Sequence, residues 1–181
     1  MTTTALDHSV PTGTWELDPV HSHIGFEVEY LVGTFRGELR DVEATLSVVD
    51  DELVVSGSAR VAGIDVKDEN LSAHLQSPEF FDAERHPELR FASTELAPSD
   101  GAVAVRGELT MKGVTRPVEL EGTISEPATD PYGRERVGLK LTTTVDRTDF
   151  GIDWNAPLPS GGQALANDVT LVAELYFTKA A

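Results

Sequence analysis

Residues 23–30 read HIGFEVEY, and this stretch decides the fold. Its apolar side chains occupy every second position, at Ile24, Phe26, Val28 and Tyr30, with polar residues or glycine between them. Successive side chains of a β-strand point to opposite faces, so this alternation predicts a strand with one buried and one exposed face.

The same alternation continues to the end of the chain. It recurs over residues 35–39, 42–48, 53–61, 89–91, 103–111, 118–124, 137–145 and 169–177. The phase slips by one residue near Asp41, which predicts a β-bulge that bends a long strand. Turn residues such as Asp50-Asp51 and Pro98-Ser99-Asp100-Gly101 separate the runs. About eight long strands result.

Residues 68–83 interrupt the strand pattern. Leu71 and Leu75 lie four positions apart among good helix formers, and Asp68 is placed to cap the helix N-terminus. Ser77 and Pro78 then predict a second short turn. The fold class is therefore all-β, an eight-stranded antiparallel barrel with a short helical insert between strands 4 and 5. Closure removes the exposed edges that long strands would otherwise present.

The length of 181 residues suits one domain. Residues 1–12 are polar and lack periodicity, so we expect a flexible N-terminal tail followed by a single barrel domain over residues 13–181. The chain contains no cysteine, which excludes disulfides, thiol catalysis and cysteine-ligated zinc.

The charge limits the possible partners. The formal net charge is −17, which repels phosphate backbones and anionic headgroups, so we expect no nucleic-acid binding and no stable membrane insertion. No segment approaches the roughly 18 apolar residues of a membrane span. The first ten residues lack the features of a secretory signal, which predicts a cytoplasmic location.

The inward rows mix large apolar residues with small ones. The small ones are Gly37, Gly57, Ala59, Ser93, Gly107, Thr143 and Ala173. Small residues beside aromatic rings predict an apolar cavity that accepts a guest. The same pattern arises if they only ease strand crossing, so a filled barrel acting as a ligand-free interaction module stays open. Almost no ionisable side chain lies on these rows, which argues against an enzyme.

Two polar motifs have residue types that could support chemistry. His21 and His23 would lie on the same side of a strand and could share a metal, so a metal-dependent hydrolase is the alternative function. No HExxH motif supports it. Arg147 and Asp149 would also share a face. They predict an ion pair near a strand end or, alternatively, a contact with a ligand headgroup.

An ordered set of motifs resembles the YceI family of lipocalin-like, polyisoprenoid-binding proteins. The motifs are Trp15–Phe26, Gly33–Gly37, Asp68–Leu75, Ser77–Asp82, His86–Phe91, Gly107–Val118 and Arg147–Ile152. The resemblance covers residues 14–178. It implies a lipocalin-like eight-stranded barrel with a long hydrophobic pore, a bound isoprenoid or similar lipid, and a homodimer.

We therefore expect a carrier for a long apolar ligand, a polyisoprenoid or an isoprenoid quinone-like lipid, with no catalytic residue, no metal and no other cofactor. The expected ligand-binding residues are Phe26, Val28, Phe35, Leu75, Phe80, Phe81, Phe91, Leu109, Leu141, Phe150, Trp154, Leu171 and Leu175. Residues 153–167 form a long loop rich in glycine and proline, which we expect to carry Trp154 as a mobile lid over one barrel mouth.

The length of the ligand follows from its binding energy. Each buried CH₂ contributes roughly 0.8 kcal/mol, association costs about 4–15 kcal/mol, and micromolar binding needs about 8 kcal/mol net. These figures predict an apolar chain of about 15 to 30 carbons.

Overall fold

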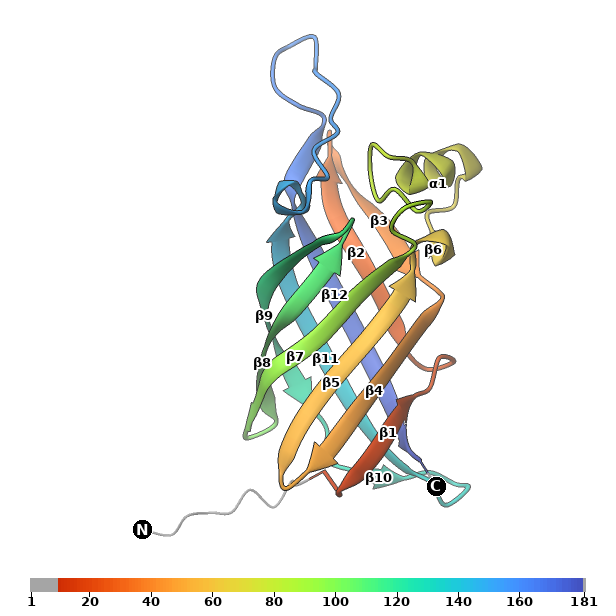
Figure 1. Cartoon of the computed structure of the whole chain (residues 1–181), viewed down its shortest axis with the longest axis vertical. Helices are drawn as coiled ribbons and strands as arrows, with labels where there is room; N and C mark the ends of the chain where they lie inside the picture. Colours follow the sequence, from red (N-terminus) through yellow and green to blue (C-terminus); the bar gives the residue numbers. More distant parts are fainter. Residues whose placement is uncertain (1–9, 181) are drawn as a thin grey trace.

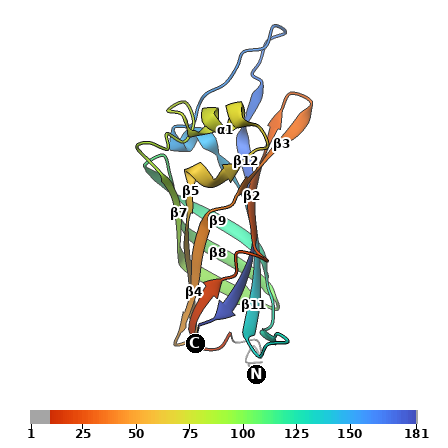
Figure 2. The same cartoon turned by 90° about the vertical axis from the view of Figure 1, so that its right-hand side faces the viewer.

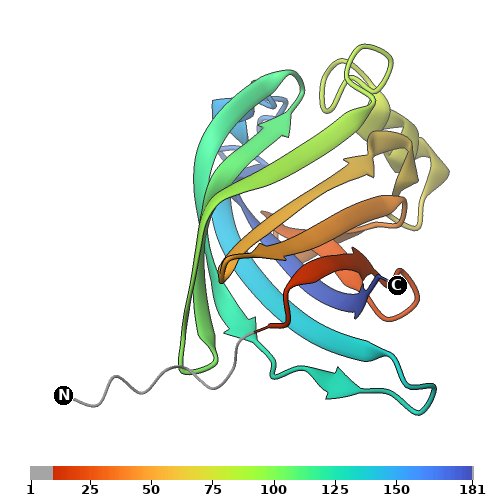
Figure 3. The same cartoon turned by 60° about the horizontal axis from the view of Figure 1, so that its bottom comes forward.

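The computed structural model describes residues 10–180, and within that range twelve strands form one antiparallel sheet (Figure 1). They are β1 (Gly13–Leu17), β2 (His23–Tyr30), β3 (Gly33–Leu39), β4 (Val42–Val49), β5 (Glu52–Arg60), β6 (Ile64–Asp65), β7 (Glu88–Ser99), β8 (Ala102–Met111), β9 (Val114–Ile124), β10 (Ala128–Thr129), β11 (Glu135–Asp146) and β12 (Leu165–Lys179). The pairing of β11 with β12 closes the sheet into a barrel (Figure 3).

Four of the eight barrel strands are interrupted. The last residues of β12 pair with β1, while its longer first part pairs with β2, so β1 and β2 lie end to end beside it. Likewise β4 pairs with β1 and β3 pairs with β2. In the same way β6 continues β5 beside β3, and β10 continues β9 beside β11. Counting each interrupted strand once, the eight-stranded antiparallel barrel is confirmed.

The phase slip near Asp41 is a break between two strands. Leu39 at the end of β3 and Val42 at the start of β4 both face the interior. They lie three positions apart, so an unbroken strand would place them on opposite faces. The chain stays tied to its neighbours there, because the Arg40 N–H donates to the Gly63 carbonyl and the Arg60 N–H to the Asp41 carbonyl, each at 3.0 Å. At this place the structure therefore has an interruption of the barrel strand where a β-bulge was expected.

The helical insert lies between β6 and β7. It follows the short helix η1 (Val61–Gly63), and its helix α1 (Glu69–Gln76) is capped as expected, with the Asp68 carboxylate accepting the Leu71 N–H at 2.8 Å. The helix is shorter than 68–83, because Ser77 before Pro78 is extended and hydrogen-bonded turns follow. With each interrupted strand counted once, the insert joins the third barrel strand to the fourth.

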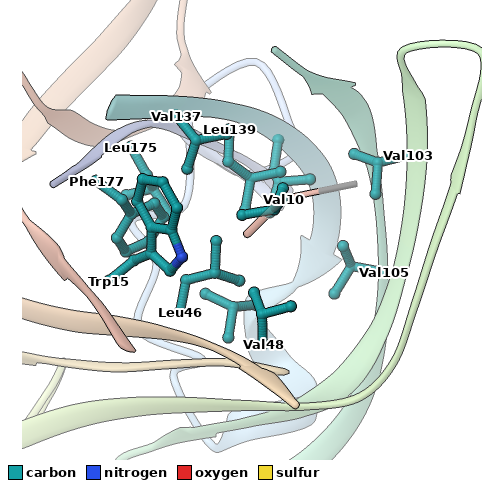
Figure 4. Packing of buried hydrophobic residues seen from close by; sticks show 12 residues of the cluster. Val10, Trp15, Leu46, Val48, Val103, Val105, Val137, Leu139, Leu175 and Phe177 are labelled. Carbon is teal, nitrogen blue, oxygen red and sulfur yellow. The ribbon is translucent and has the colours of Figure 1, made fainter. Parts of the chain in front are cut away.

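Buried side chains fill the end of the barrel where β1 and β10 lie, which is the lower end in Figure 1. Trp15, Leu46, Leu139 and Phe177 are fully buried there and point toward one another (Figure 4). Val10 belongs to the same cluster, and the Trp15 indole donates to the Pro11 carbonyl at 3.1 Å. Residues 10–12, assigned to the tail by the sequence, therefore pack against the barrel. Residues 1–9 of that tail lie outside the described residues.

A polar clamp ties the lower end together. The Arg136 guanidinium contacts the Asp18 carboxylate at 2.6 Å and the Asp130 carboxylate at 2.8 Å. Burial acts to raise the pKa of Asp18, but hydrogen bonds from Arg136, His21 and the Val20 N–H outweigh it and lower that pKa to about 2. The clamp joins the end of β1 to the β10–β11 turn.

Candidate ligand cavity

An apolar cavity of about 320 Å³ lies at the other end of the barrel, beneath α1, and is called the upper cavity here. Its wall is built by strands, by the helical insert and by the loop that follows the short helix η2 (Arg147–Phe150). Residues that alternation places on the inner faces of β2, β3 and β12 supply Phe26, Phe35 and Leu171. The insert adds Leu75 and Phe80 from above.

A second apolar cavity, of about 170 Å³, lies deeper and is called the lower cavity. Four residues line both cavities, which therefore adjoin: Leu39, Leu89, Met111 and Leu171. Beyond the lower cavity lies the filled end with Trp15 and Leu46. The implied long pore is thus closed at one end, because the large side chains of β1, β4 and β12 occupy it.

Six of the seven small inward residues divide into two groups, and the seventh, Ser93, accepts the Val55 N–H at 2.9 Å. Gly57, Ala59, Thr143 and Ala173 line the lower cavity, as the sequence argument requires. Gly37 and Gly107 do not create space, because a Cβ at these positions would lie 2.3 Å from the Phe26 ring and 2.6 Å from the Phe91 ring, respectively. Each glycine instead lets a neighbouring aromatic ring lie flat against its strand. The presence of cavities is at odds with a filled interaction module.

Aromatic rings from two distant segments meet at the mouth of the upper cavity. The His74 ring of α1 makes edge contacts with Phe80 and with Trp154, each with centroids 4.8 Å apart. Phe80 and Trp154 also contact each other, at 5.3 Å. The His74 Nε2 lies 2.5 Å from the Glu79 carboxylate. This contact fixes the imidazole between the two apolar rings.

Arg147 is buried with 4 % of its surface exposed, and it lies on the wall of the upper cavity. Its guanidinium donates to the carbonyls of Ile152, Trp154 and Ala166 at 2.7 to 2.9 Å. Burial lowers its pKa. Among the described residues it forms no ion pair with a carboxylate, so the expected Arg147–Asp149 ion pair is wrong. Asp149 lies on the turn of η2, and its backbone carbonyl accepts a hydrogen bond from the Arg116 side chain at 3.1 Å.

The loop that carries Trp154 is anchored at its base. Arg147 holds the Trp154 carbonyl, and the Asn155 side chain donates to the Leu165 carbonyl at 2.7 Å and accepts the Leu165 N–H at 2.9 Å. Trp154 thus lies over the upper mouth, where the lid was expected. The tip of the loop, residues 157–163, projects away from the barrel (Figure 1). The mobility of the lid stays a prediction.

Twelve of the thirteen expected ligand-binding residues line one or both cavities. The upper cavity has Phe26, Val28, Phe35, Leu75, Phe80, Phe81, Trp154 and Leu171, and the lower has Phe91, Leu109, Leu141, Leu171 and Leu175. Phe150 lines neither cavity. It is packed in the surrounding hydrophobic cluster with 2 % of its surface exposed, because the turn of η2 places its ring behind the wall.

Sequence reasoning left several wall residues out of the expected site. The upper cavity also has Tyr30, Leu39, Ile64, Leu71, His74, Leu89, Met111, Val145, Arg147, Ile152, Leu165 and Val169 on its wall. Strand alternation could have supplied Tyr30 and Val169, which share faces with Val28 and Leu171. No such signal exists for Ile152, which lies in an irregular segment.

The two histidines of the alternative function lie apart from both cavities. His21 is in the turn before β2 and contacts Asp18 at 2.7 Å, whereas His23 begins β2 and lies 3.5 Å from Glu38. Within residues 10–180, no group of three or more histidine, cysteine, aspartate or glutamate side chains is arranged to hold a metal ion. No helix in the same range is long and apolar enough to cross a bilayer.

Comparison with known sequences finds one family. A family model described as the YceI-like domain matches residues 15–177. A UPF0312 protein of Pseudomonas putida is 30% identical over 137 residues, which cover 73% of this chain and 71% of that protein. A UPF0312 protein of Photorhabdus laumondii is 29% identical over 134 residues, covering 72% and 70%.

Solved structures share the fold. BcnA of Burkholderia cenocepacia has a TM-score of 0.76 and 18% identity, covering 88% of this chain and 98% of that one. The YCEI protein of Campylobacter jejuni has a TM-score of 0.71 and 21% identity, covering 91% and 97%. A polyisoprenoid binding domain from Saccharophagus degradans has a TM-score of 0.67 and 11% identity, covering 92% and 98%.

Proposed function

This chain belongs to the YceI family, and from that premise we propose that it binds one long apolar molecule, of the polyisoprenoid kind, inside its barrel. One observation carries the proposal: two adjoining apolar cavities run from the mouth beside Trp154 down to a filled end. The likeness to a polyisoprenoid binding domain supports the ligand class. The role is binding and carriage rather than catalysis.

The volumes suit a chain of limited length. A cavity of about 150 Å³ accommodates benzene, which corresponds to about 25 Å³ per carbon. On that scale the upper cavity of about 320 Å³ holds roughly 13 carbons and the lower cavity of about 170 Å³ roughly 7. A chain of roughly 20 carbons therefore fills both, and this length falls within the range required for micromolar binding.

The orientation of the ligand follows from where the polar groups lie. Tyr30, His74, Arg147 and Trp154 are the wall residues of the upper cavity that carry hydrogen-bonding side chains. A ligand with a polar end, such as an alcohol or a quinone, places that end among them, because an unpaired polar group in the lower cavity would lose its hydrogen bonds. The apolar end then points toward Ala173 and Leu175.

The test is native mass spectrometry with organic extraction of protein purified from its own host, followed by titration with all-trans-retinol, a fluorescent isoprenoid alcohol of about 20 carbons, the length the cavities hold. We expect a co-purified apolar molecule or stoichiometric uptake of retinol. An empty barrel that takes up no retinol would refute the proposal. Stoichiometric zinc or iron bound through His21 and His23, found by elemental analysis, would favour the hydrolase instead. The homodimer and the cytoplasmic location stay predictions.

A further inference from the structure

The turn between β2 and β3 exposes two aliphatic side chains. Leu31 is 56 % exposed and Val32 is fully exposed, and Tyr30 beside them is 44 % exposed. Figure 2 shows this hairpin at the same end of the molecule as α1 and the long loop before β12, whereas β1 and the β4–β5 turn lie toward the other end. These three residues are called the β2–β3 tip here.

Turn geometry does not explain these residues. The other tight hairpin turns of the barrel have polar residues or glycine at their centres, namely Asp50-Asp51, Asp100-Gly101 and Lys112-Gly113. Leu31 has a φ of 52°, close to that of the first residue in each of these turns. Such a backbone conformation favours glycine, asparagine or aspartate over leucine. Since burial does not compensate for it, the apolar tip needs another explanation.

The β2–β3 tip is continuous with the upper cavity. Tyr30 is part of the tip and also part of the cavity wall. The Leu31 N–H donates to the Ala164 carbonyl at 3.0 Å, which joins the tip to the loop that carries Trp154. A surface that meets the tip therefore also meets the region through which an apolar ligand enters.

The surrounding charge selects the kind of surface. Glu27, Glu29, Asp146 and Asp168 line one shallow groove on the outer face beside the tip. No lysine or arginine occurs from Glu29 to Phe35, and Arg36 pairs with Glu27 at 3.0 Å. The tip thus lacks the cations that bind anionic lipids, and its carboxylates repel them.

We propose that the β2–β3 tip makes brief contact with neutral or zwitterionic lipid surfaces, so that the ligand passes between bilayer and upper cavity without crossing water. The inference rests on the proposed function, because a long apolar ligand resides in bilayers. Three side chains are too few for a stable protein interface, which buries about 1,000 Å² or more. They are enough for transient insertion, and the net charge of −17 opposes permanent docking.

The experiment compares two routes of loading with retinol. One route supplies retinol in phosphatidylcholine vesicles and the other as a cyclodextrin complex, and energy transfer from tryptophan follows uptake in each. The proteins are wild type, Val32→Asp, and the matched control Val49→Asp, whose valine is 61 % exposed in the β4–β5 turn near the opposite end.

We expect Val32→Asp to load about tenfold more slowly from vesicles, because the apolar burial of one valine is lost. Loading from cyclodextrin should be unchanged, and Val49→Asp should match wild type by both routes. The wild-type rate should rise in proportion to vesicle concentration, as collisional transfer requires, and should fall when phosphatidylglycerol is added.

Each contrary result has a distinct meaning. Equal vesicle loading by all three proteins, or a vesicle rate independent of vesicle concentration, would overturn the membrane contact while leaving the proposed function intact. A Val32→Asp defect by both routes would also overturn it, since the tip would then act on binding itself. Failure of wild type to take up retinol by either route would overturn the proposed function and, with it, this inference.

Discussion

Ala173→Leu tests whether a single chain occupies both cavities. Ala173 lies on β12, where it pairs with Leu141 and Ile24 and lines the lower cavity. A leucine adds three carbons to that cavity and displaces about three ligand carbons, which corresponds to roughly 2.4 kcal/mol of lost burial. The dissociation constant of a chain that fills both cavities should therefore rise about 50-fold.

Chain length supplies the internal reference. An isoprenoid alcohol of about 15 carbons fits largely within the upper cavity, whereas one of about 20 carbons must enter the lower cavity as well. Wild type should prefer the longer chain, and Ala173→Leu should reduce that preference by about 50-fold while weakening the shorter chain much less. Isothermal titration calorimetry of both alcohols against both proteins measures the ratio.

The control separates lost space from a damaged fold. Ala104→Leu makes the same chemical change at an exposed position on β8 and should leave both affinities unchanged. Urea unfolding of Ala173→Leu should give a free energy near that of wild type, because the added carbons fill existing space. Equal weakening of both alcohols, or no weakening of either, would refute the view that the ligand extends into the lower cavity.

Three further changes test the parts that surround the cavities. Arg147→Met should lower the free energy of unfolding in urea by about 3 kcal/mol, because three carbonyls lose a buried donor; wild-type stability would contradict the anchoring role. Trp154→Ala should weaken retinol binding about tenfold in a fluorescence titration, because the mouth of the upper cavity loses an apolar wall. An unchanged affinity would show that the ligand does not enter beside Trp154. For Asp18, whose folded pKa of about 2 lies below its ordinary 3.8, the stabilisation is present above about pH 4 and is lost as the pH falls toward 2. As the pH falls from 5 to 2, the melting temperature of Asp18→Asn should therefore fall less steeply than that of wild type. Parallel curves for the two proteins would show that Asp18 does not contribute to the loss of stability in acid.

Local signals determined the elements of this fold. The alternation in residues 23–30 and its repeats placed Phe26, Val28 and Leu171 on the inside, since period two depends only on backbone geometry. The Asp68 cap placed the start of α1 correctly, because capping involves neighbours within one turn. These local rules sufficed to assign the long strands from β2 onward and to place on the inside those strand residues that line the cavities.

Tertiary structure alone decided where the barrel is hollow. Alternation shows which way a side chain faces but not what lies across the barrel from it. The sequence therefore could not distinguish Gly37, which makes room for the Phe26 ring, from Ala173, which lines the lower cavity. Cavities depend on how volumes from distant strands add up at each level of the barrel. For the same reason only the folded chain could place the carbonyls of an irregular loop around Arg147, and the rings of Trp15 and Phe177 together at the closed end.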